Sequence, residues 1–422
     1  MKRYLVVWLG ATAALLALVA TANAVVDPYG VFRLVDAPGF NAVKPKAELH
    51  GGMVKAYQVL RVRPRTLILG NSRAEVGLSP DHAAWPSADR PVFNLALPGT
   101  GPTTTLAYLQ HAIASAGNAK IVRVVWGVDF PDFLTDTTIL PASGPQRVEA
   151  RLLVGPDGAP NRERPWQQLR DAGESLFTLS ALFDSAQTLA SQRDPYAPDL
   201  ASNGFNPLRE YVKVAKEEGY GNLFRQTDLD NTRAYARRPR SIVDASGTTS
   251  ADLIALRRIL AICRRNGIAL TLVIYPIHAH LLEIIRATDH WPAFEDWKRA
   301  LVRAVADEAR DAGGTSVPVV DFSGFHRYAT EPVPARGDLR STMRWYWEPG
   351  HFKRELGDLM IDRILATPDA PQDFGVALDA SNVERQLADL RVAEAAYRDR
   401  HAGEVAELER MAVELRPRSR MR

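Results

Sequence analysis

Short apolar runs recur along the chain and are typical of buried β-strands. The runs are Thr66–Leu69, Val92–Leu95, Ile121–Val128, Ile268–Tyr275 and Val317–Asp321. Helical patterns separate several of them, at Thr104–Ser115, Asp252–Cys263 and Trp291–Ala312. Strands that alternate with helices indicate parallel strands joined by right-handed crossovers. The pattern therefore predicts an α/β fold, a three-layer sandwich around a mainly parallel central sheet of about five strands.

This core is expected in two pieces, residues 62–135 and 250–366. Between them the chain is polar and rich in Pro, Arg, Asp and Asn, without a repeated strand–helix unit. We predict a largely helical insertion over residues 136–249 that covers one end of the sheet. After the core, apolar positions at helical spacing predict a C-terminal helix over residues 381–415, which packs on its own domain or binds a partner.

The N-terminus is the most apolar part of the chain. Tyr4–Val26 carries no charged residue, and as a helix it would extend about 35 Å, enough to cross a bilayer. Lys2 and Arg3 would hold its start in the cytoplasm. Ala22-Asn23-Ala24 resembles a signal-peptidase site, so residues 1–26 are either a transmembrane anchor or a cleaved signal peptide, with a buried soluble helix as a third alternative.

Either form of export leaves residues 27–61 as a juxtamembrane lead-in and the main domain outside the cytoplasmic membrane. The expected location is thus a single-pass protein of that membrane with a periplasmic or extracellular domain. Net charge is only +3, from 52 basic and 49 acidic residues, which argues against a nucleic-acid partner. Cys263 is the single cysteine, so no intrachain disulfide can form.

The first strand runs into a tight turn in the segment TLILGNSRAEVGLSP, where Ser72 follows Gly70 and Asn71. Ligands collect at the carboxyl ends of parallel strands, so Ser72 is either presented for chemistry or part of an ordinary strand–helix turn. The segment lacks the second glycine of a G-x-S-x-G elbow, because Ala74 stands there, and this argues against an ordinary α/β-hydrolase.

Two later segments carry partners for such a serine. The loop NLALPGTGP leaves the second strand, and the amide of Gly99 is a candidate oxyanion donor. In RWYWEPGHFKREL, Glu348 and His351 are separated by a Pro-Gly turn, so the carboxylate can orient the imidazole. Each segment alone also fits a structural loop or a helix-capping turn.

Together the three segments resemble the SGNH (GDSL-like) hydrolase superfamily. The match covers about residues 62–135 and 250–366, and is nearest to the membrane-anchored, extracytoplasmic branch that moves acyl groups on cell-surface polymers. The resemblance implies Ser72 as nucleophile, His351 as base, Glu348 as its orienter and Gly99 as an oxyanion donor. We therefore expect the Ser72 hydroxyl within about 3–4 Å of the His351 ring, with Glu348 on the far side.

Two positions depart from the superfamily pattern. Asp129 follows the third strand where an oxyanion-donating Asn is usual, and an ionised carboxylate there would have to be protonated, turned away or used otherwise. The acid before His351 is Glu348 instead of the usual Asp. These departures leave open a catalytically inactive relative that binds a glycan or an envelope assembly partner.

Other polar residues lie close to these segments in sequence. His278, in the YPIHAH segment with His280, is an alternative base or a residue that borders the substrate. Arg73 and Arg344 are candidates for holding an anionic substrate group. No Cys/His cluster predicts a metal site, and no Walker or dinucleotide motif predicts a cofactor.

The function expected from the resemblance is that of a serine esterase or O-acyltransferase. Its substrate would be an acylated glycan or another ester of an exported polymer. A transferase would also need a membrane partner that hands acyl groups across the bilayer.

Overall fold

The protein is described by a computed structural model that covers residues 1–422 except 118–119, 138–148, 244–249, 315 and 417–422. A six-stranded sheet lies at its centre, in the order β10-β7-β6-β3-β1-β2. All neighbouring strands are parallel except β10, which runs antiparallel to β7. The strands are β1 (Thr66–Leu69), β2 (Val92–Asn94), β3 (Arg123–Val128), β6 (Ala269–Ile274), β7 (Val319–Asp321) and β10 (Val376–Ala377).

The predicted α/β fold with a mainly parallel sheet is confirmed. The predicted number of about five strands is one too low, because it does not include the edge strand β10. That strand has only two residues, both exposed, and it joins the sheet by pairing with Val320 and Asp321. Such a short, solvent-facing segment has no apolar run, so its pairing becomes visible only in the folded chain.

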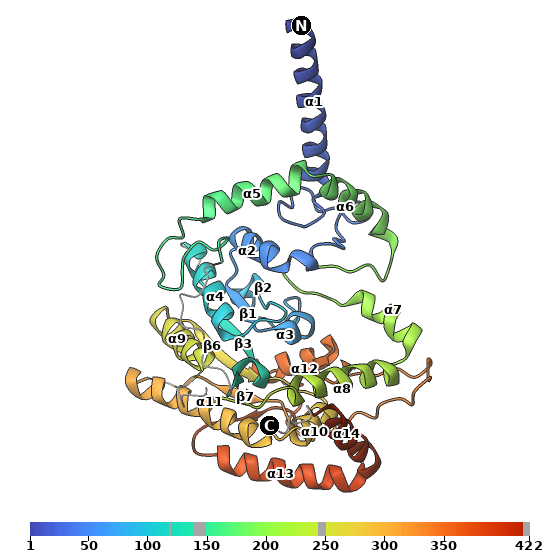
Figure 1. Ribbon diagram of the computed structural model, residues 1–422. Helices are drawn as coiled ribbons and strands as arrows, with labels where there is room; N and C mark the ends of the chain where they lie inside the picture. Colours follow the sequence, from blue (N-terminus) through green and yellow to red (C-terminus); the bar gives the residue numbers. More distant parts are fainter. Residues whose placement is uncertain (118–119, 138–148, 244–249, 315, 417–422) are drawn as a thin grey trace, which may run out of the picture.

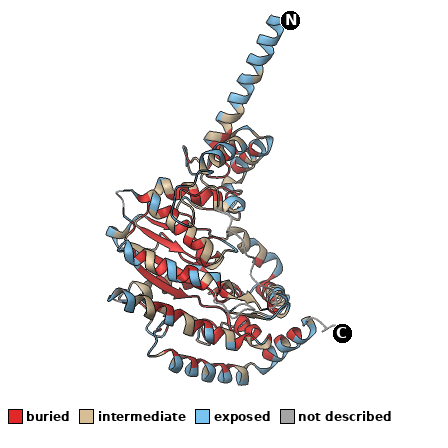
Figure 2. Ribbon diagram, turned by 60° about the vertical axis from the view of Figure 1, so that its left-hand side comes forward, coloured by how far each residue is buried: buried red, intermediate tan, exposed pale blue. Residues whose placement is uncertain are grey.

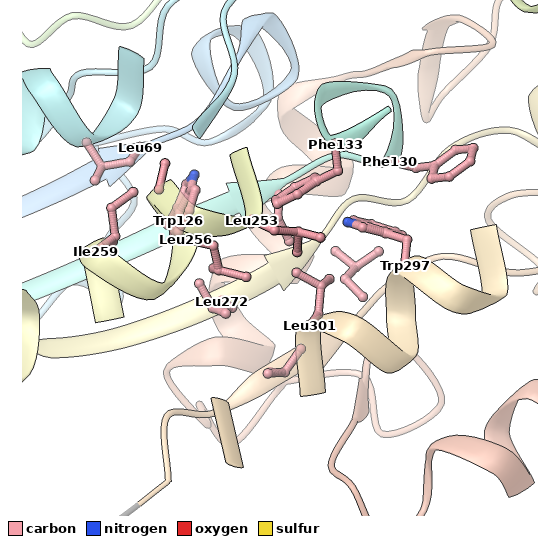
Figure 3. Close-up of a cluster of buried hydrophobic side chains, with 14 of the residues drawn as sticks. Leu69, Trp126, Phe130, Phe133, Leu253, Leu256, Ile259, Leu272, Trp297 and Leu301 are labelled. Carbon is pink, nitrogen blue, oxygen red and sulfur yellow. The ribbon is translucent and has the colours of Figure 1, made fainter. Parts of the chain in front are cut away.

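Hydrophobic side chains alternate between the two faces of the sheet, as the pleat requires. Leu67 and Leu69 join one buried cluster, which contains residues of the helices α4 (Pro102–Ala116), α9 (Ala251–Arg265) and α11 (Trp291–Ala312). Ile68 joins a second cluster with residues of α3 (Ser72–Gly77) and α12 (Arg354–Ile364). Figure 3 shows part of the first cluster, with Trp126 of β3 beside Ile259 of α9. The buried strands lie between helices in Figure 2, an arrangement compatible with the predicted three-layer sandwich.

Helices of the core lie around the sheet. They are α2 (Gly51–Val62), α3 (Ser72–Gly77), α4 (Pro102–Ala116), α9 (Ala251–Arg265), α10 (Ala279–Ala287), α11 (Trp291–Ala312) and α12 (Arg354–Ile364). The insertion is largely helical, as predicted, and contributes α5 (Arg164–Phe177), α6 (Leu179–Ala190), α7 (Arg209–Glu218), α8 (Tyr220–Ala236) and the short pair β4 (Thr135–Asp136) and β5 (Arg240–Ser241). Residues 138–148 and 244–249 of the predicted insertion lie outside the described part of the chain.

The C-terminal segment forms two helices, so the prediction of one helix over residues 381–415 is corrected. α13 (Val383–Arg400) ends at His401, and α14 (Ala402–Leu415) follows directly. The bend lets α14 contact α8 and α10, whereas α13 contacts α11. Two packing directions therefore replace the single helix that the continuous apolar spacing indicated.

The N-terminal helix α1 (Lys2–Val26) projects from the rest of the molecule in Figure 1. It is long and apolar enough to span a membrane, with a mean hydropathy of 2.2 over its most apolar window, and none of that window is buried. The alternative of a buried soluble helix is therefore wrong. Only the last turns of α1 contact the protein, between α5 and α6.

A buried ion pair joins the lead-in to the core. Lys55 of α2 is fully buried and its Nζ lies 2.8 Å from Glu75 Oε1 of α3, while it also donates to the Ala96 carbonyl. Burial lowers the pKa of Lys55, which Glu75 partly opposes. A charge taken out of water in this way is stable only while its partner is present.

We predict that Lys55→Met lowers the free energy of unfolding by about 3–5 kcal/mol, because Glu75 then becomes an unpaired buried charge. The double variant Lys55→Met/Glu75→Leu should regain most of this loss. Chemical denaturation followed by tryptophan fluorescence measures both. As a control, Lys213→Met removes an exposed pair with Glu217 and should cost less than about 1 kcal/mol. Equal losses in the Lys55 and Lys213 variants would contradict the prediction.

Candidate active site

The chain turns sharply between β1 and α3. Gly70 has a φ of +143°, and a Cβ at this position would overlap the Tyr275 hydroxyl, so only glycine fits here. Asn71 caps α3 by accepting a hydrogen bond from the Arg73 amide (3.1 Å). Ser72 is thus the first residue of α3, half-buried at the carboxyl end of a central strand.

His351 lies next to this serine. The strands β8 (Tyr346–Glu348) and β9 (His351–Phe352) form an antiparallel pair around the Pro349-Gly350 turn. His351 Nε2 is 2.7 Å from Ser72 Oγ, and Nδ1 hydrogen-bonds Glu348 Oε1. The predicted meeting of Ser72 and His351, with Glu348 on the far side of the ring, is confirmed.

Glu348 is held as an ionised acceptor. Its side chain is only 5% exposed, and burial alone would raise its pKa. His351, the Gly350 amide (2.9 Å from Oε2) and Arg73 together outweigh burial and lower the pKa of Glu348. With a carboxylate at Nδ1, the imidazole carries its proton on Nδ1 and leaves Nε2 free to accept the Ser72 proton.

Glycine contacts bring α3, which carries Ser72, against β9, which carries His351. A Cβ at Gly77 of α3 would overlap the ring of Phe352 in β9, and a Cβ at Gly357 of α12 would overlap the Gly77 carbonyl. Backbones therefore approach here more closely than any side chain would allow. This approach sets the distance between Ser72 and His351.

Arg73 bridges the two halves of the site. Its Nε donates to the Gly350 carbonyl (2.6 Å), and its guanidinium forms an ion pair with Asp129. The sequence suggested that Arg73 binds an anionic substrate group. In the structure Arg73 instead contacts two groups of the protein itself, the Gly350 carbonyl and the Asp129 carboxylate. These contacts connect the turn of Ser72 to the turn of His351.

Asp129 is used in this ion pair instead of acting as an oxyanion donor. It also accepts a hydrogen bond from Asn71 Nδ2 (3.0 Å), which lies equally close to Asp132 Oδ2 (3.0 Å). Of the alternatives that the sequence left open for Asp129, engagement by other protein groups is the one observed. Arg73 and Asn71 offset its charge beside the nucleophile.

Asp132 and Asn71 are site residues that the sequence analysis missed. Burial raises the pKa of Asp132 to about 7, even though Arg73 and Asn71 act in the opposite direction. No motif marks an Asp in the short turn Phe130–Phe133, because its environment comes from β1 and α3. The cap position of Asn71, directly before Ser72, was the one signal available for that residue.

Gly99 lies in the loop after β2 with a φ of +68°, and a Cβ there would meet nothing within 4 Å. The start of its loop is fixed near the nucleophile, because the Leu97 amide donates to the Gly70 carbonyl (3.0 Å). The amide of Ser72 is a second candidate oxyanion donor, because the first amide of a helix has no acceptor within that helix. The oxyanion role of Gly99 stays a prediction.

His278 is directed away from Ser72, and the alternative that it acts as base is wrong. Its Nε2 pairs with the Glu331 carbonyl (2.8 Å) and its Nδ1 accepts from the His280 amide (3.2 Å). Burial lowers the pKa of His278 to about 3, so it is neutral. Its amide donates to the Pro349 carbonyl (3.0 Å), which supports the turn before His351 through the backbone.

Arg344 is exposed, and its guanidinium lies over the Trp345 ring, 4.4 Å from the centroid. This contact does not bring it to Ser72, and its predicted substrate role stays untested. Among the described residues, no group of three or more His, Cys, Asp and Glu side chains is arranged to hold a metal ion.

A scan against protein-family models finds no match for this chain, and a search of curated proteins finds none either. The resemblance to the SGNH superfamily therefore rests on the sequence segments around Ser72, Gly99 and His351, and it stays a prediction.

The raised pKa of Asp132 predicts how stability changes with pH. Unfolded, this carboxyl ionises near pH 4, whereas in the folded protein it keeps its proton up to about pH 7. Its contribution to the free energy of unfolding is therefore fully present below about pH 4 and is lost as the pH rises through 7.

Denaturation curves at a series of pH values would measure this. Asp132→Asn should flatten the decline in stability between these pH values, and Asp230→Asn, at a side chain that is 74% exposed, should leave it as in the wild type. An unchanged decline in Asp132→Asn would show that another group titrates.

Proposed function

We propose that this protein is a serine esterase or O-acyltransferase of SGNH type that forms an acyl-enzyme on Ser72. The observation that carries the proposal is the continuous chain of contacts from Ser72 Oγ through both nitrogens of His351 to Glu348. Ser72 and His351 are 279 positions apart, and side chains so distant in sequence rarely meet in this order by packing alone. The lowered pKa of Glu348 keeps it ionised, as an acceptor for the imidazole must be.

In the first half-reaction, Ser72 Oγ attacks the carbonyl carbon of the ester while His351 Nε2 takes the hydroxyl proton. Glu348 stabilises the imidazolium that forms. Collapse of the tetrahedral intermediate breaks the bond to the leaving alcohol, which receives the proton from His351. The acyl group then remains on Ser72.

In the second half-reaction, water or a carbohydrate hydroxyl attacks the acyl-enzyme. His351 accepts its proton and returns it to Ser72 Oγ as the new acid or ester leaves. The amides of Ser72 and Gly99 are the proposed donors to both oxyanions. Each such donor contributes roughly 3–4 kcal/mol of transition-state stabilisation.

The proposed substrate is an acylated glycan or another ester of an exported polymer. α1 would anchor the protein in the cytoplasmic membrane, with Lys2 and Arg3 inside and the main domain outside. An enzyme in that position has no access to cytosolic acyl-CoA, so a transferase needs a membrane partner that delivers acyl groups, whereas a hydrolase needs none.

An uncleaved anchor fits the surroundings of Asn23, the middle residue of the cleavage-like sequence. Asn23 is fully buried, its Nδ2 donates to the Leu176 carbonyl (2.9 Å) and its Oδ1 accepts from Ser185 Oγ (2.9 Å). Cleavage after Ala24 would remove these contacts and leave the polar groups of α5 and α6 without them.

A second candidate function is binding without catalysis. The observation that favours it is the ion pair of Arg73 and Asp129 beside Ser72, where the superfamily usually has an oxyanion-donating Asn. Such a protein would hold a glycan or an assembly partner in the same place.

Labelling with a fluorophosphonate probe separates the two functions. Wild-type protein should form a covalent adduct on Ser72 Oγ with release of fluoride. Ser72→Ala should abolish the label and His351→Ala should slow it strongly, because Oγ then has no base. A Ser185→Ala variant, which changes a structural hydroxyl, serves as control. Folded wild-type protein that takes up no label would favour the binding function.

An acetyl-ester assay on the full-length protein then tests the chemistry, with and without a glycan acceptor. Release of acetate alone indicates a hydrolase, whereas acetylated glycan indicates a transferase. Turnover that persists in Ser72→Ala would contradict the acyl-enzyme.

The bridge of Arg73 predicts a positioning role. Arg73→Lys keeps a positive charge but cannot reach both Gly350 and Asp129, so kcat should fall by roughly 10- to 100-fold with KM little changed. Steady-state kinetics across pH measure this, and the pH profile should stay close to that of the wild type because lysine keeps the charge that helps to hold Glu348 ionised. Arg233→Lys, at a side chain that is 60% exposed in a surface pair with Asp230, is the matched control. A selective rise in KM would point to substrate binding by Arg73 instead.

A further inference from the structure

Two helices of the insertion lie across the base of the membrane-spanning helix. α5 and α6 both contact α1, and Figure 1 shows them extending sideways from the point where α1 joins the domain. From Val19 onward several side chains of α1 are partly buried, and Asn23 and Val26 are buried. α5 and α6 therefore cover the C-terminal end of α1, where it joins the domain.

One face of α5 binds the domain. Asp171 is buried, and its carboxylate accepts hydrogen bonds from Tyr57 Oη of α2 (2.6 Å) and from Arg151 Nε (2.8 Å). The opposite face carries Trp166, Leu169 and Phe177, which are 74%, 65% and 52% exposed. Their spacing places them on one stripe of the helix. Trp166, at the edge of this stripe, lines a cavity together with Gly52 of α2 and Thr104 of α4, whereas Leu169 and Phe177 do not line it.

α6 has the same two-faced character. Ser185 bonds Asn23 of α1, and Asp184 accepts from Tyr29 Oη (2.8 Å), so this side faces the protein. On the other side Leu179 and Phe183 are 82% and 71% exposed. Large apolar side chains on two adjacent helices are a costly surface to leave in water.

We propose that α5 and α6 lie in the interfacial layer of the membrane that α1 spans, with their apolar faces at the boundary between headgroups and acyl chains. We assign lipid to this surface because the surface lies beside the part of α1 that would leave the hydrocarbon core of the membrane. From Lys2 to Val19 the helix rises about 27 Å, close to the roughly 30 Å of a hydrocarbon core. The contacts with α5 and α6 thus begin where the hydrocarbon ends.

The side chains on these faces suit that layer. Amphipathic helices bind membrane interfaces through an apolar face that carries Phe and Leu side chains. Leu169 and Phe177 of α5 and Phe183 of α6 are exposed side chains of this kind. Because α5 and α6 are fixed to both α1 and the domain, this contact sets the tilt of the whole domain against the membrane.

Depth-dependent quenching in lipid nanodiscs tests the proposal on the full-length chain. In a Cys263→Ala background, single cysteines at Leu169 or Phe183 carry an environment-sensitive fluorophore. Lipids with a spin label near the headgroup should quench both several-fold more than a label at Val392, an exposed apolar residue of α13 (71%). Equal, water-like behaviour at all three positions would overturn the proposal.

A second outcome would also overturn it. Shifted emission at Leu169 and Phe183 without quenching by lipid, together with intermolecular crosslinks, would mean that a second copy or another protein covers the surface. If the cysteine variants do not fold, photoactivatable lipids applied to the unaltered protein give the same information. Peptides of α5 and α6 should then carry the lipid adducts, and peptides of α13 should not.

Discussion

The closeness of α3 to β9 and α12 is the constraint on which the site depends. Gly77 and Gly357 have no Cβ, so the backbone of the helix that carries Ser72 reaches the strand that carries His351. The resulting hydrogen bond joins side chains 279 positions apart. Ser72 follows the carboxyl end of β1, and β9 belongs to a separate pair with β8, whose turn is held beside the end of β6 by the hydrogen bond from the His278 amide to the Pro349 carbonyl.

Paired charges keep this arrangement rigid. Lys55 ties α2 to Glu75 of α3, and Arg73 ties α3 to the Gly350 turn and to Asp129 at the end of β3. In a surrounding that excludes water, each pair is stable only as a pair, so movement of one element exposes an unpaired charge in the next. Ser72 is thereby fixed from both sides, which keeps its hydroxyl within hydrogen-bond distance of His351.

The sequence predicted what depends on local patterns. Five of the six strands appear as apolar runs, and Ser72, Glu348 and His351 stand in recognisable turns. What it missed depends on distant partners. The pKa of Asp132 arises from burial by elements remote in sequence, Arg73 turns inward because Asp129 and Gly350 are near it, and β10 exists only by pairing with β7. The bend at His401 likewise follows from two packing surfaces that one helical period cannot distinguish.

Between α1 and Ser72 the described residues form no loose linker. Asn41 and Lys44 are buried and donate to the last carbonyls of α1, and Gln58 of α2 donates to the Gly30 carbonyl (3.0 Å). α2 in turn holds α3 through Lys55, so each contact from α1 to Ser72 is made by buried groups. If α1 spans a membrane as proposed, these contacts hold Ser72 at a constant height above the lipid surface. The proposed substrate would have to come to that height, which favours esters on polymers or carriers close to the membrane over freely diffusing ones.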